Sequence, residues 1–286
     1  MNPWVAGARP RTLPASVSPV LVGTAAAASE GPVVLWRAGA ALVVALALQV
    51  GVNYANDYSD GRRGTDAHRQ GPVRLTASGV VAPEAVRTAA LVAFLVAAVA
   101  GFALAVAVDL RLILVGVACI AAAALYTGGP RPYGYSGFGE VAVLVFFGFV
   151  ATAGSAYVQL ERLPTVALVA AVPVGLLACA SLVANNLRDI GTDAEAGKRT
   201  LAVRLGPART RRLYGACVGA AFATVIALAL TRPPAALALL AVPLAVAPIR
   251  IVSTRSDPPS LVAALVATAR LQLVTSILLA AGLWIS

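Results

Sequence analysis

The sequence predicts an all-α fold, a polytopic membrane bundle of about nine transmembrane helices. Of its 286 residues, 59% are apolar and only 12% are charged, and the mean hydropathy is +0.85. An ordinary soluble domain is about 45–50% apolar and about 25% charged. The composition excludes a disordered chain, a collagen-like repeat and a small disulfide scaffold. We interpret residues 1–286 as one integral membrane domain in the lipid bilayer.

Nine apolar segments come close to the roughly 17–25 residues that a helix needs to cross the hydrocarbon core. Short turns at 29–32 and 109–111 separate some of them. The first segment follows two arginines, as a signal peptide would. It contains two prolines and is followed by further apolar segments, so we expect a retained helix. The predicted spans are 12–29, 33–55, 84–108, 112–127, 138–159, 165–186, 212–230, 235–250 and 259–284.

The distribution of positive charge predicts the orientation of these spans. An odd number of spans places the two termini on opposite sides. Of the 22 lysines and arginines, 17 lie in loops on the N-terminal side, and only Arg37, Arg111, Arg162 and Arg232 lie in loops on the other side. Inserted proteins collect such residues in cytoplasmic loops, so we expect a multi-pass cell-membrane protein with a cytoplasmic N-terminus and a C-terminus on the opposite side. No interleaving of basic and aromatic residues indicates nucleic-acid binding.

Two polar clusters interrupt the apolar pattern where predicted spans end. Residues 53–66 read N-Y-A-N-D-Y-S-D-G-R-R-G-T-D, and residues 185–199 read N-N-L-R-D-I-G-T-D-A-E-A-G-K-R. They open the two longest and most charged connections, 56–83 and 187–211. Long loops of mixed charge on one side of a bundle are where we expect the chemistry.

The spacing within each cluster predicts a column of oxygen atoms. Asn56 and Asp60 are four residues apart, as are Asn185, Asp189 and Asp193, and residues four apart share one face of a helix. Mg²⁺ is commonly held by one or two carboxylates, several waters and phosphate oxygens. Two facing columns with arginines and a lysine nearby would therefore suit metal ions that clamp a diphosphate.

Two other interpretations of the clusters remain open at this point. Asp and Asn at helix ends often cap the helix or meet water. Intramembrane carboxylates also serve ion-coupled transporters. Transporter sites lie near the middle of the bilayer, however, whereas these clusters lie at the ends of spans.

The clusters resemble the two motifs of the UbiA superfamily of intramembrane aromatic prenyltransferases. Residues 56–60 match its N-D-x-x-D motif and residues 189–193 its D-x-x-x-D motif. Within the superfamily, the chain is most similar to the 1,4-dihydroxy-2-naphthoate polyprenyltransferases of menaquinone biosynthesis. G-P-V-R-L at 71–75, Y-T-G-G-P-R-P-Y-G-Y at 126–135 and A-G-K-R-T-L-A-V-R-L-G at 196–206 carry this similarity.

The resemblance implies an activity: transfer of a polyprenyl group from a polyprenyl diphosphate to 1,4-dihydroxy-2-naphthoate, with loss of diphosphate and CO₂, giving demethylmenaquinol. It also implies Mg²⁺ as the cofactor and a set of site residues. The implied catalytic residues are Asp60, Asp189 and Lys198. The implied substrate-binding residues are Asn56, Asn185, Arg74, Tyr126, Arg131 and Arg199. The implied metal ligands are Asp57, Asp60, Asp66, Asp189 and Asp193.

Two positions depart from the superfamily pattern. A third aspartate often follows the first motif, but here that position is Gly64, and we expect Asp66 to replace it. In the superfamily, the loop after the fourth helix carries a lysine, but this sequence has Pro130 at that position. Arg131 is then the remaining cation of the loop that could face an acidic aromatic or a phosphate. A different aromatic acceptor, such as a benzoate, homogentisate or haem, is the alternative within the superfamily, and an ion-coupled transporter is the alternative outside it.

Overall fold

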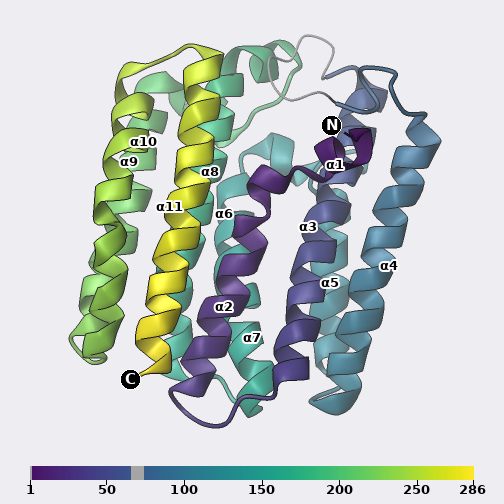
Figure 1. The fold of residues 1–286 in the computed structure, drawn as a ribbon. Coiled ribbons are helices and arrows are strands. Elements are labelled where there is room, and N and C mark those ends of the chain that lie inside the picture. Colours follow the sequence, from purple (N-terminus) through teal and green to yellow (C-terminus); the bar gives the residue numbers. More distant parts are fainter. Residues whose placement is uncertain (1, 66–73) are drawn as a thin grey trace.

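The computed structural model describes residues 2–65 and 74–286, and in this part of the chain every regular element is helical. The helices stand side by side as one bundle, with the two termini at opposite ends (Figure 1). A short helix α1 (Pro3–Ala8) and the turn η1 (Pro10–Thr12) precede the bundle. The bundle elements are α2 (Pro14–Ala28), α3 (Leu35–Arg63), α4 (Pro83–Ala107), α5 (Leu112–Leu125), the consecutive α6 (Gly139–Val143), η3 (Leu144–Val150) and α7 (Ala151–Leu160), α8 (Thr165–Glu195), α9 (Leu201–Ala229), the consecutive η4 (Pro233–Ala241) and α10 (Val242–Thr254), and α11 (Pro258–Trp284).

The prediction of an all-α membrane bundle is confirmed, and each predicted span has a helical counterpart. Within residues 2–65 and 74–286, seven helical segments are long and apolar enough to cross a bilayer, while α2 and α5 are shorter. Length and composition alone therefore do not establish the count of nine. Ion pairs join segments at the end of the bundle opposite the two clusters. Glu30 pairs with both Arg162 and Arg232, and Arg37, in the first turn of α3, pairs with Glu161.

Three helices extend well beyond their predicted spans. α3 continues to Arg63 rather than residue 55, and α8 continues to Glu195 rather than 186. α9 begins at Leu201 rather than 212, with a kink at Gly206, where φ is 73°. Hydropathy indicates where the lipid ends, whereas a helix ends where its backbone is capped. For α3 this cap is Gly64, whose left-handed φ of 71° lets its N–H bond the carbonyl groups of Asp60 and Gly61. Both polar clusters are therefore helical over most of their length.

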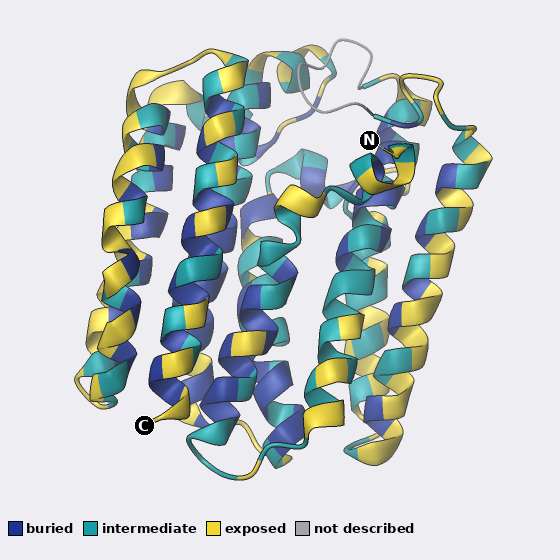
Figure 2. Ribbon diagram, viewed as in Figure 1, coloured by how far each residue is buried: buried dark blue, intermediate teal, exposed yellow. Residues whose placement is uncertain are grey.

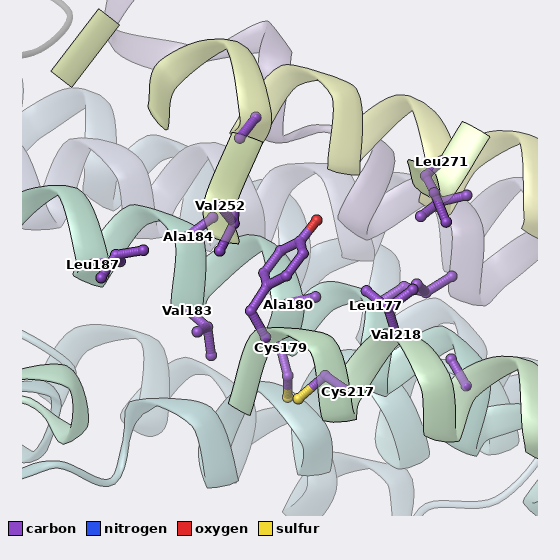
Figure 3. Packing of buried hydrophobic residues seen from close by; sticks show 14 of the residues in the cluster. Leu177, Cys179, Ala180, Val183, Ala184, Leu187, Cys217, Val218, Val252 and Leu271 are labelled. Carbon is purple, nitrogen blue, oxygen red and sulfur yellow. The ribbon is translucent and has the colours of Figure 1, made fainter. Parts of the chain in front are cut away.

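The bundle consists of a well-packed part and a part that faces outward. α8 is central to the first: its side chains pack with those of α9, α10 and α11 in a cluster that includes Leu177, Val183, Val218 and Val252 (Figure 3). α4 and α5 carry long exposed apolar faces, as expected of helices that face lipid (Figure 2). α3 packs mainly on α4, and α8 mainly on α9, so the two cluster-bearing helices belong to different pairs.

Close packing between α2 and α7 depends on one glycine. A Cβ atom at Gly23 would come within 2.1 Å of the carbonyl oxygen of Thr152, whereas a Cβ at Gly39 in α3 would meet nothing within 4 Å. We expect Gly23→Ala to cost about 1–3 kcal/mol by overpacking and to lower the thermal unfolding midpoint in detergent. Gly39→Ala, the matched control, should maintain or raise it because alanine favours the helix. Equal midpoints for the two variants would contradict this packing.

Candidate active site

The two polar clusters meet at one cavity of about 650 Å³. Asp60, Asp189 and Asp193 all line it, at the end of the bundle where α3 and α8 terminate. Deeper in the bundle, side chains of α4, α5 and the α6–α7 segment give it an apolar lining that includes Phe102, Phe146 and Phe147. The cavity thus has a charged mouth and a long apolar interior, which suits an amphiphile with an anionic head.

The polar lining on α3 extends deeper than the sequence motif. Gln49, Asn53, Asn56 and Asp60 follow one another at helical spacing, and all four line the cavity. Gln49 Nε2 donates to Asn53 Oδ1 at 3.4 Å, and Asn56 Oδ1 accepts from the Thr127 hydroxyl at 2.7 Å. The sequence analysis missed Gln49 and Asn53 as site residues. The sequence feature that could have indicated them is two amide side chains within an apolar segment, at helical spacing from Asn56 and Asp60.

On α8, a buried arginine orients the first carboxylate. Arg188 donates from Nε and Nη2 to the two carboxylate oxygens of Asp189, at 2.7 Å each, and from Nη2 to Asn185 Oδ1 at 2.9 Å. The side chains of Arg188 and Asp189 are only 4% and 6% exposed. Bidentate pairing of this kind fixes the plane of the carboxylate. Arg188 itself does not line the cavity, so it supports Asp189 from behind.

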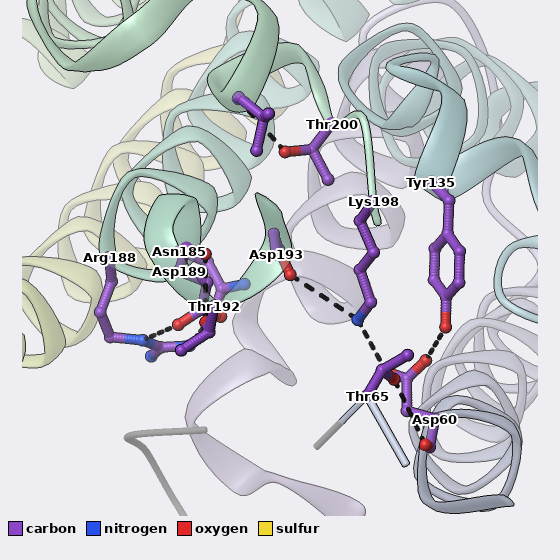
Figure 4. A network of polar contacts seen from close by, with 11 residues as sticks. Asp60, Thr65, Tyr135, Asn185, Arg188, Asp189, Thr192, Asp193, Lys198 and Thr200 are labelled. Atoms are coloured by element: carbon purple, nitrogen blue, oxygen red, sulfur yellow. Dashed lines mark hydrogen bonds and ion pairs between the residues drawn. The ribbon is translucent and has the colours of Figure 1, made fainter. Parts of the chain in front are cut away.

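Lys198 lies between the two clusters and contacts both (Figure 4). Its Nζ is 3.6 Å from Asp60 Oδ2 and 3.7 Å from Asp193 Oδ1. The ammonium group also lies 4.7 Å from the ring centroid of Tyr135, whose hydroxyl donates a hydrogen bond to Asp60 Oδ1. The carboxylates of α3 and α8 are thus close enough to share one cation, as the facing-column prediction required.

Tyr135, the last residue of the 126–135 motif, is a site residue that the sequence analysis did not select. Burial, and then the neighbouring negative charge of Asp60, raise the pKa of Tyr135. Its hydroxyl therefore remains a proton donor to the carboxylate at neutral pH. The connection that carries it is held to the second cluster, because the backbone N–H of Arg199 donates to the Tyr135 carbonyl at 2.8 Å.

The remaining predicted substrate-binding residues divide into two groups. Arg74 and Tyr126 line the cavity, as do Asn56 and Asn185. Arg131 and Arg199 are exposed and are not part of the lining. Both belong to connections of which other residues, Tyr135 and Lys198, line the cavity. The structure therefore does not bring Arg131 and Arg199 to the cavity.

Arg9 and Arg11 line the cavity although the sequence suggested only a topological role for them. Arg9 adopts a left-handed backbone conformation, with φ 54°, between α1 and η1. Its Nη2 atom is buried and donates no hydrogen bond to any of the described residues. These two arginines add positive charge to the mouth of the cavity on the side of α2.

Asp57 does not face the cavity, contrary to the prediction that it is a metal ligand. It is 1% exposed, and its two carboxylate oxygens accept the backbone N–H groups of Leu75 at 2.9 Å and Thr76 at 2.8 Å. One residue along a helix rotates a side chain by about 100°, which turns Asp57 away from the face of Asn56 and Asp60. Asp57 instead anchors the chain that follows Arg74. Asp66, the other predicted ligand in this region, lies outside the described residues.

This role for Asp57 predicts a particular kinetic phenotype. Asp57→Ala leaves the N–H groups of Leu75 and Thr76 without their acceptor next to Arg74, so we expect a slower rate for the activity that the resemblance implies, and lower thermal stability. The Mg²⁺ concentration for half-maximal activity should stay within about twofold of the wild type, because no metal ligand is lost. Titrating Mg²⁺ against activity measures this, with Asp60→Ala as the comparison. A large increase in the Mg²⁺ concentration that Asp57→Ala needs for half-maximal activity would contradict this role and indicate that Asp57 is a metal ligand.

The carboxylates at the cavity have the chemistry that Mg²⁺ requires. Asp60 lies on one side and Asp189 and Asp193 on the other, with the amide oxygens of the two clusters nearby. In the described ranges, no three acidic, histidine or cysteine residues converge as a metal cage. A site of one or two carboxylates per ion, completed by water and phosphate oxygens, is the usual arrangement for Mg²⁺. The residues therefore fit Mg²⁺ that arrives with a diphosphate.

The comparisons with known proteins agree with this geometry. The model of the UbiA prenyltransferase family matches residues 16–274. The 1,4-dihydroxy-2-naphthoate octaprenyltransferase of Mycobacterium leprae (strain TN) is 51% identical over 98% of this chain and 95% of that protein. The protein of the same name from Mycobacterium tuberculosis is 55% identical over 85% of this chain and 83% of that protein.

A solved structure with the same fold comes from a distant relative. The UbiA homologue of Archaeoglobus fulgidus bound to GPP and Mg²⁺ superposes with a TM-score of 0.65, covering 96% of this chain and 99% of that one. At 14% sequence identity this likeness concerns the fold alone. From the family match and the close relatives together, the chain belongs to the UbiA prenyltransferase family.

Proposed function

We propose that this chain transfers a polyprenyl group from a polyprenyl diphosphate to 1,4-dihydroxy-2-naphthoate, giving demethylmenaquinol for menaquinone biosynthesis. The observation that carries the proposal is the position of Asp60 and Asp189 on opposite walls of one cavity that has a charged mouth and an apolar interior. The names of the relatives at 51% and 55% identity support the naphthoate as the acceptor. The prenyl chain fits the apolar lining, and its diphosphate fits the mouth.

The first chemical step is cleavage of the allylic carbon–oxygen bond. Mg²⁺, when bound, supplies positive charge that stabilises the departing diphosphate. In this chain, Asp60, Asp189 and Asp193 would hold the metal ions, and Asn56 and Asn185 lie in the same columns. Lys198, placed between the columns, would donate to a diphosphate oxygen as negative charge develops there.

The second step joins the allylic cation to the aromatic ring. The electron-rich ring carbon that bears the carboxylate forms a bond to the first carbon of the prenyl group. The bond from that ring carbon to the carboxylate then breaks, so that its electron pair restores the aromatic ring and CO₂ leaves. The apolar lining around Phe146 and Phe147 keeps water away from the cation until this happens. Their aromatic faces also stabilise positive charge.

The orientation in the membrane is part of the same proposal. The arginine distribution supports cytoplasmic clusters and a cytoplasmic N-terminus, with the C-terminus across the membrane. Alkaline phosphatase fused after Ser286 should therefore be active in a bacterial host, and a green fluorescent protein fused there should stay dark. Fusions of both reporters at the N-terminus are the control. The opposite pattern at Ser286 would overturn the assigned orientation.

The activity is tested with purified protein in nanodiscs. Mg²⁺, a polyprenyl diphosphate and 1,4-dihydroxy-2-naphthoate should yield the prenylated, decarboxylated quinol by mass spectrometry, and EDTA should abolish it. 4-Hydroxybenzoate, homogentisate and haem are offered in parallel. Faster product formation from one of these acceptors would reassign the substrate. Proton- or sodium-coupled flux in liposomes without any covalent product would favour the transporter interpretation.

A further inference from the structure

A buried acid outside the cavity holds one of the amides that line it. Glu140, in the first turn of α6, accepts a hydrogen bond from Asn186 Nδ2 at 2.9 Å. Both residues are 8% exposed. Asn186 lines the cavity, whereas Glu140 lies behind it and is not part of the lining. Burying a carboxylate within a membrane bundle is costly, and such residues usually have a function.

This contact determines which end of the amide faces the cavity. A carboxylate is an acceptor only, so Asn186 must direct its amino group towards Glu140. Its oxygen, Oδ1, is then the other corner of the planar amide and points away from the Glu140 contact. Among the described residues, no group donates a hydrogen bond to that oxygen, and the pairing with Glu140 is the single hydrogen bond of the Asn186 side chain. A fixed hydrogen-bond acceptor is therefore available on the cavity wall.

The position of Asn186 suits the aromatic substrate better than the diphosphate. It precedes Asp189 by three residues on α8, one helical turn further from the charged mouth. Its neighbour Asn185 lies at nearly the same depth, but Asn185 Oδ1 already accepts a hydrogen bond from Arg188, whereas Asn186 Oδ1 accepts none from the described residues. Tyr126 lines the same cavity, and its hydroxyl is close to the start of α6: a Cβ atom at Gly139 would lie 3.1 Å from it. A hydroxylated ring bound beside Asn186 and Tyr126 would lie between the charged mouth and the apolar interior of the cavity.

We propose that Asn186 Oδ1 accepts a hydrogen bond from a ring hydroxyl of the aromatic acceptor, and that Glu140 is the positioning residue that keeps this oxygen turned towards the cavity. The inference rests on the proposed function and adds a residue for recognition of the acceptor. A phenolic hydroxyl is a strong donor, and its hydrogen bond to a buried amide oxygen rejects rings that lack the hydroxyl. It also fixes the ring relative to the allylic carbon.

The test separates binding of the two substrates. KM values for 1,4-dihydroxy-2-naphthoate and for the polyprenyl diphosphate are measured for the wild type and for Asn186→Leu, Glu140→Leu and Glu140→Gln. We expect both leucine variants to raise the KM of the naphthoate at least about tenfold and to change that of the diphosphate less than twofold. Glu140→Gln should stay near the wild type, because its amide oxygen still accepts from Asn186. The double leucine variant should be no worse than either single one, since the two residues act as one unit.

Analogues of the acceptor identify the hydroxyl. Inhibition constants are measured for 1-hydroxy-2-naphthoate, 4-hydroxy-2-naphthoate and 1,4-dimethoxy-2-naphthoate. One of the two monohydroxy compounds carries the hydroxyl that Asn186 recognises and should bind the wild type most tightly. The other monohydroxy compound and the dimethoxy compound should each bind at least about tenfold more weakly. This difference should disappear in Asn186→Leu. Tyr214→Phe, which removes a 2.7 Å hydrogen bond to Thr268 in the core away from the cavity, controls for the loss of a buried polar contact and should change neither KM.

The outcomes distinguish this inference from the proposed function. A wild-type protein that forms no prenylated naphthol overturns both. A wild-type protein that is active, with Asn186→Leu raising the KM of the diphosphate rather than of the naphthoate, overturns the inference alone. Equal binding of the dimethoxy and hydroxy compounds to the wild type also overturns it. Should Glu140→Leu fail to fold, Asn186→Leu with the analogues still decides the question.

Discussion

Asn replacement of either Asp60 or Asp189 is expected to lower kcat for prenyl transfer by about 10²–10³-fold, the loss typical of removing one group that stabilises developing charge. Each replacement removes a carboxylate charge while it retains the shape of the side chain. Because the two carboxylates lie on opposite walls of one cavity, each loss should impair the same step. Single-turnover rates with saturating substrates measure the effect and exclude product release.

A second feature distinguishes this prediction from a general loss of folding. Both variants should require more Mg²⁺ for half-maximal activity, because each removes an oxygen ligand that the cation prefers. Asp257→Asn is a suitable control: Asp257 caps α11 by accepting from the N–H of Ser260 and lies away from the cavity. Asp60→Asn with wild-type kcat and wild-type Mg²⁺ dependence would contradict the proposed role of the first cluster.

Lys198→Met is expected to have two effects of opposite sign. The ammonium group lies 3.6 Å and 3.7 Å from carboxylate oxygens of the two clusters, in the position where a diphosphate would be held. Its loss should lower kcat by about 10²-fold, since one donor to the leaving group disappears. In the absence of substrate, the same loss should tighten binding of Mg²⁺, because a positive charge beside the metal ligands has been removed.

Lys198→Arg provides the matched comparison. It retains the charge but alters the geometry of the donor, so we expect partial activity and a Mg²⁺ affinity close to that of the wild type. Calorimetric titration of Mg²⁺ into the substrate-free protein measures the second effect independently of catalysis. Weaker Mg²⁺ binding by Lys198→Met would contradict a position of this lysine between the two sets of ligands.

The sequence was sufficient to predict the parts of the fold and site that depend on local periodicity. Apolar segment lengths predicted the helices, and the spacing of four residues in Asn56 and Asp60, and in Asn185 and Asp189, predicted columns that the helices α3 and α8 do form. The extent of these helices was underestimated, because they continue through polar residues until a glycine such as Gly64 ends them.

Contacts between distant segments could not be predicted in this way. Tyr135 joins the site only because the connection after α5 folds back over α3, where the tyrosine meets Asp60. The position of Asp57 inside the motif predicts a metal ligand, but its partners in the structure, Leu75 and Thr76, are 18 and 19 residues away. The pairing of Glu140 with Asn186 spans 46 residues and likewise has no local signal.

Carboxylates from both α3 and α8 are expected to hold one diphosphate through metal ions. Electron paramagnetic resonance of Mn²⁺ with a polyprenyl thiolodiphosphate, which resists ionisation, tests this without turnover. We predict that the analogue strengthens Mn²⁺ binding to the wild type, and that Asp60→Asn and Asp189→Asn each weaken the analogue-dependent binding at least about tenfold. Wild-type binding by either variant would mean that only one cluster holds the diphosphate, and the account of a shared site would be wrong.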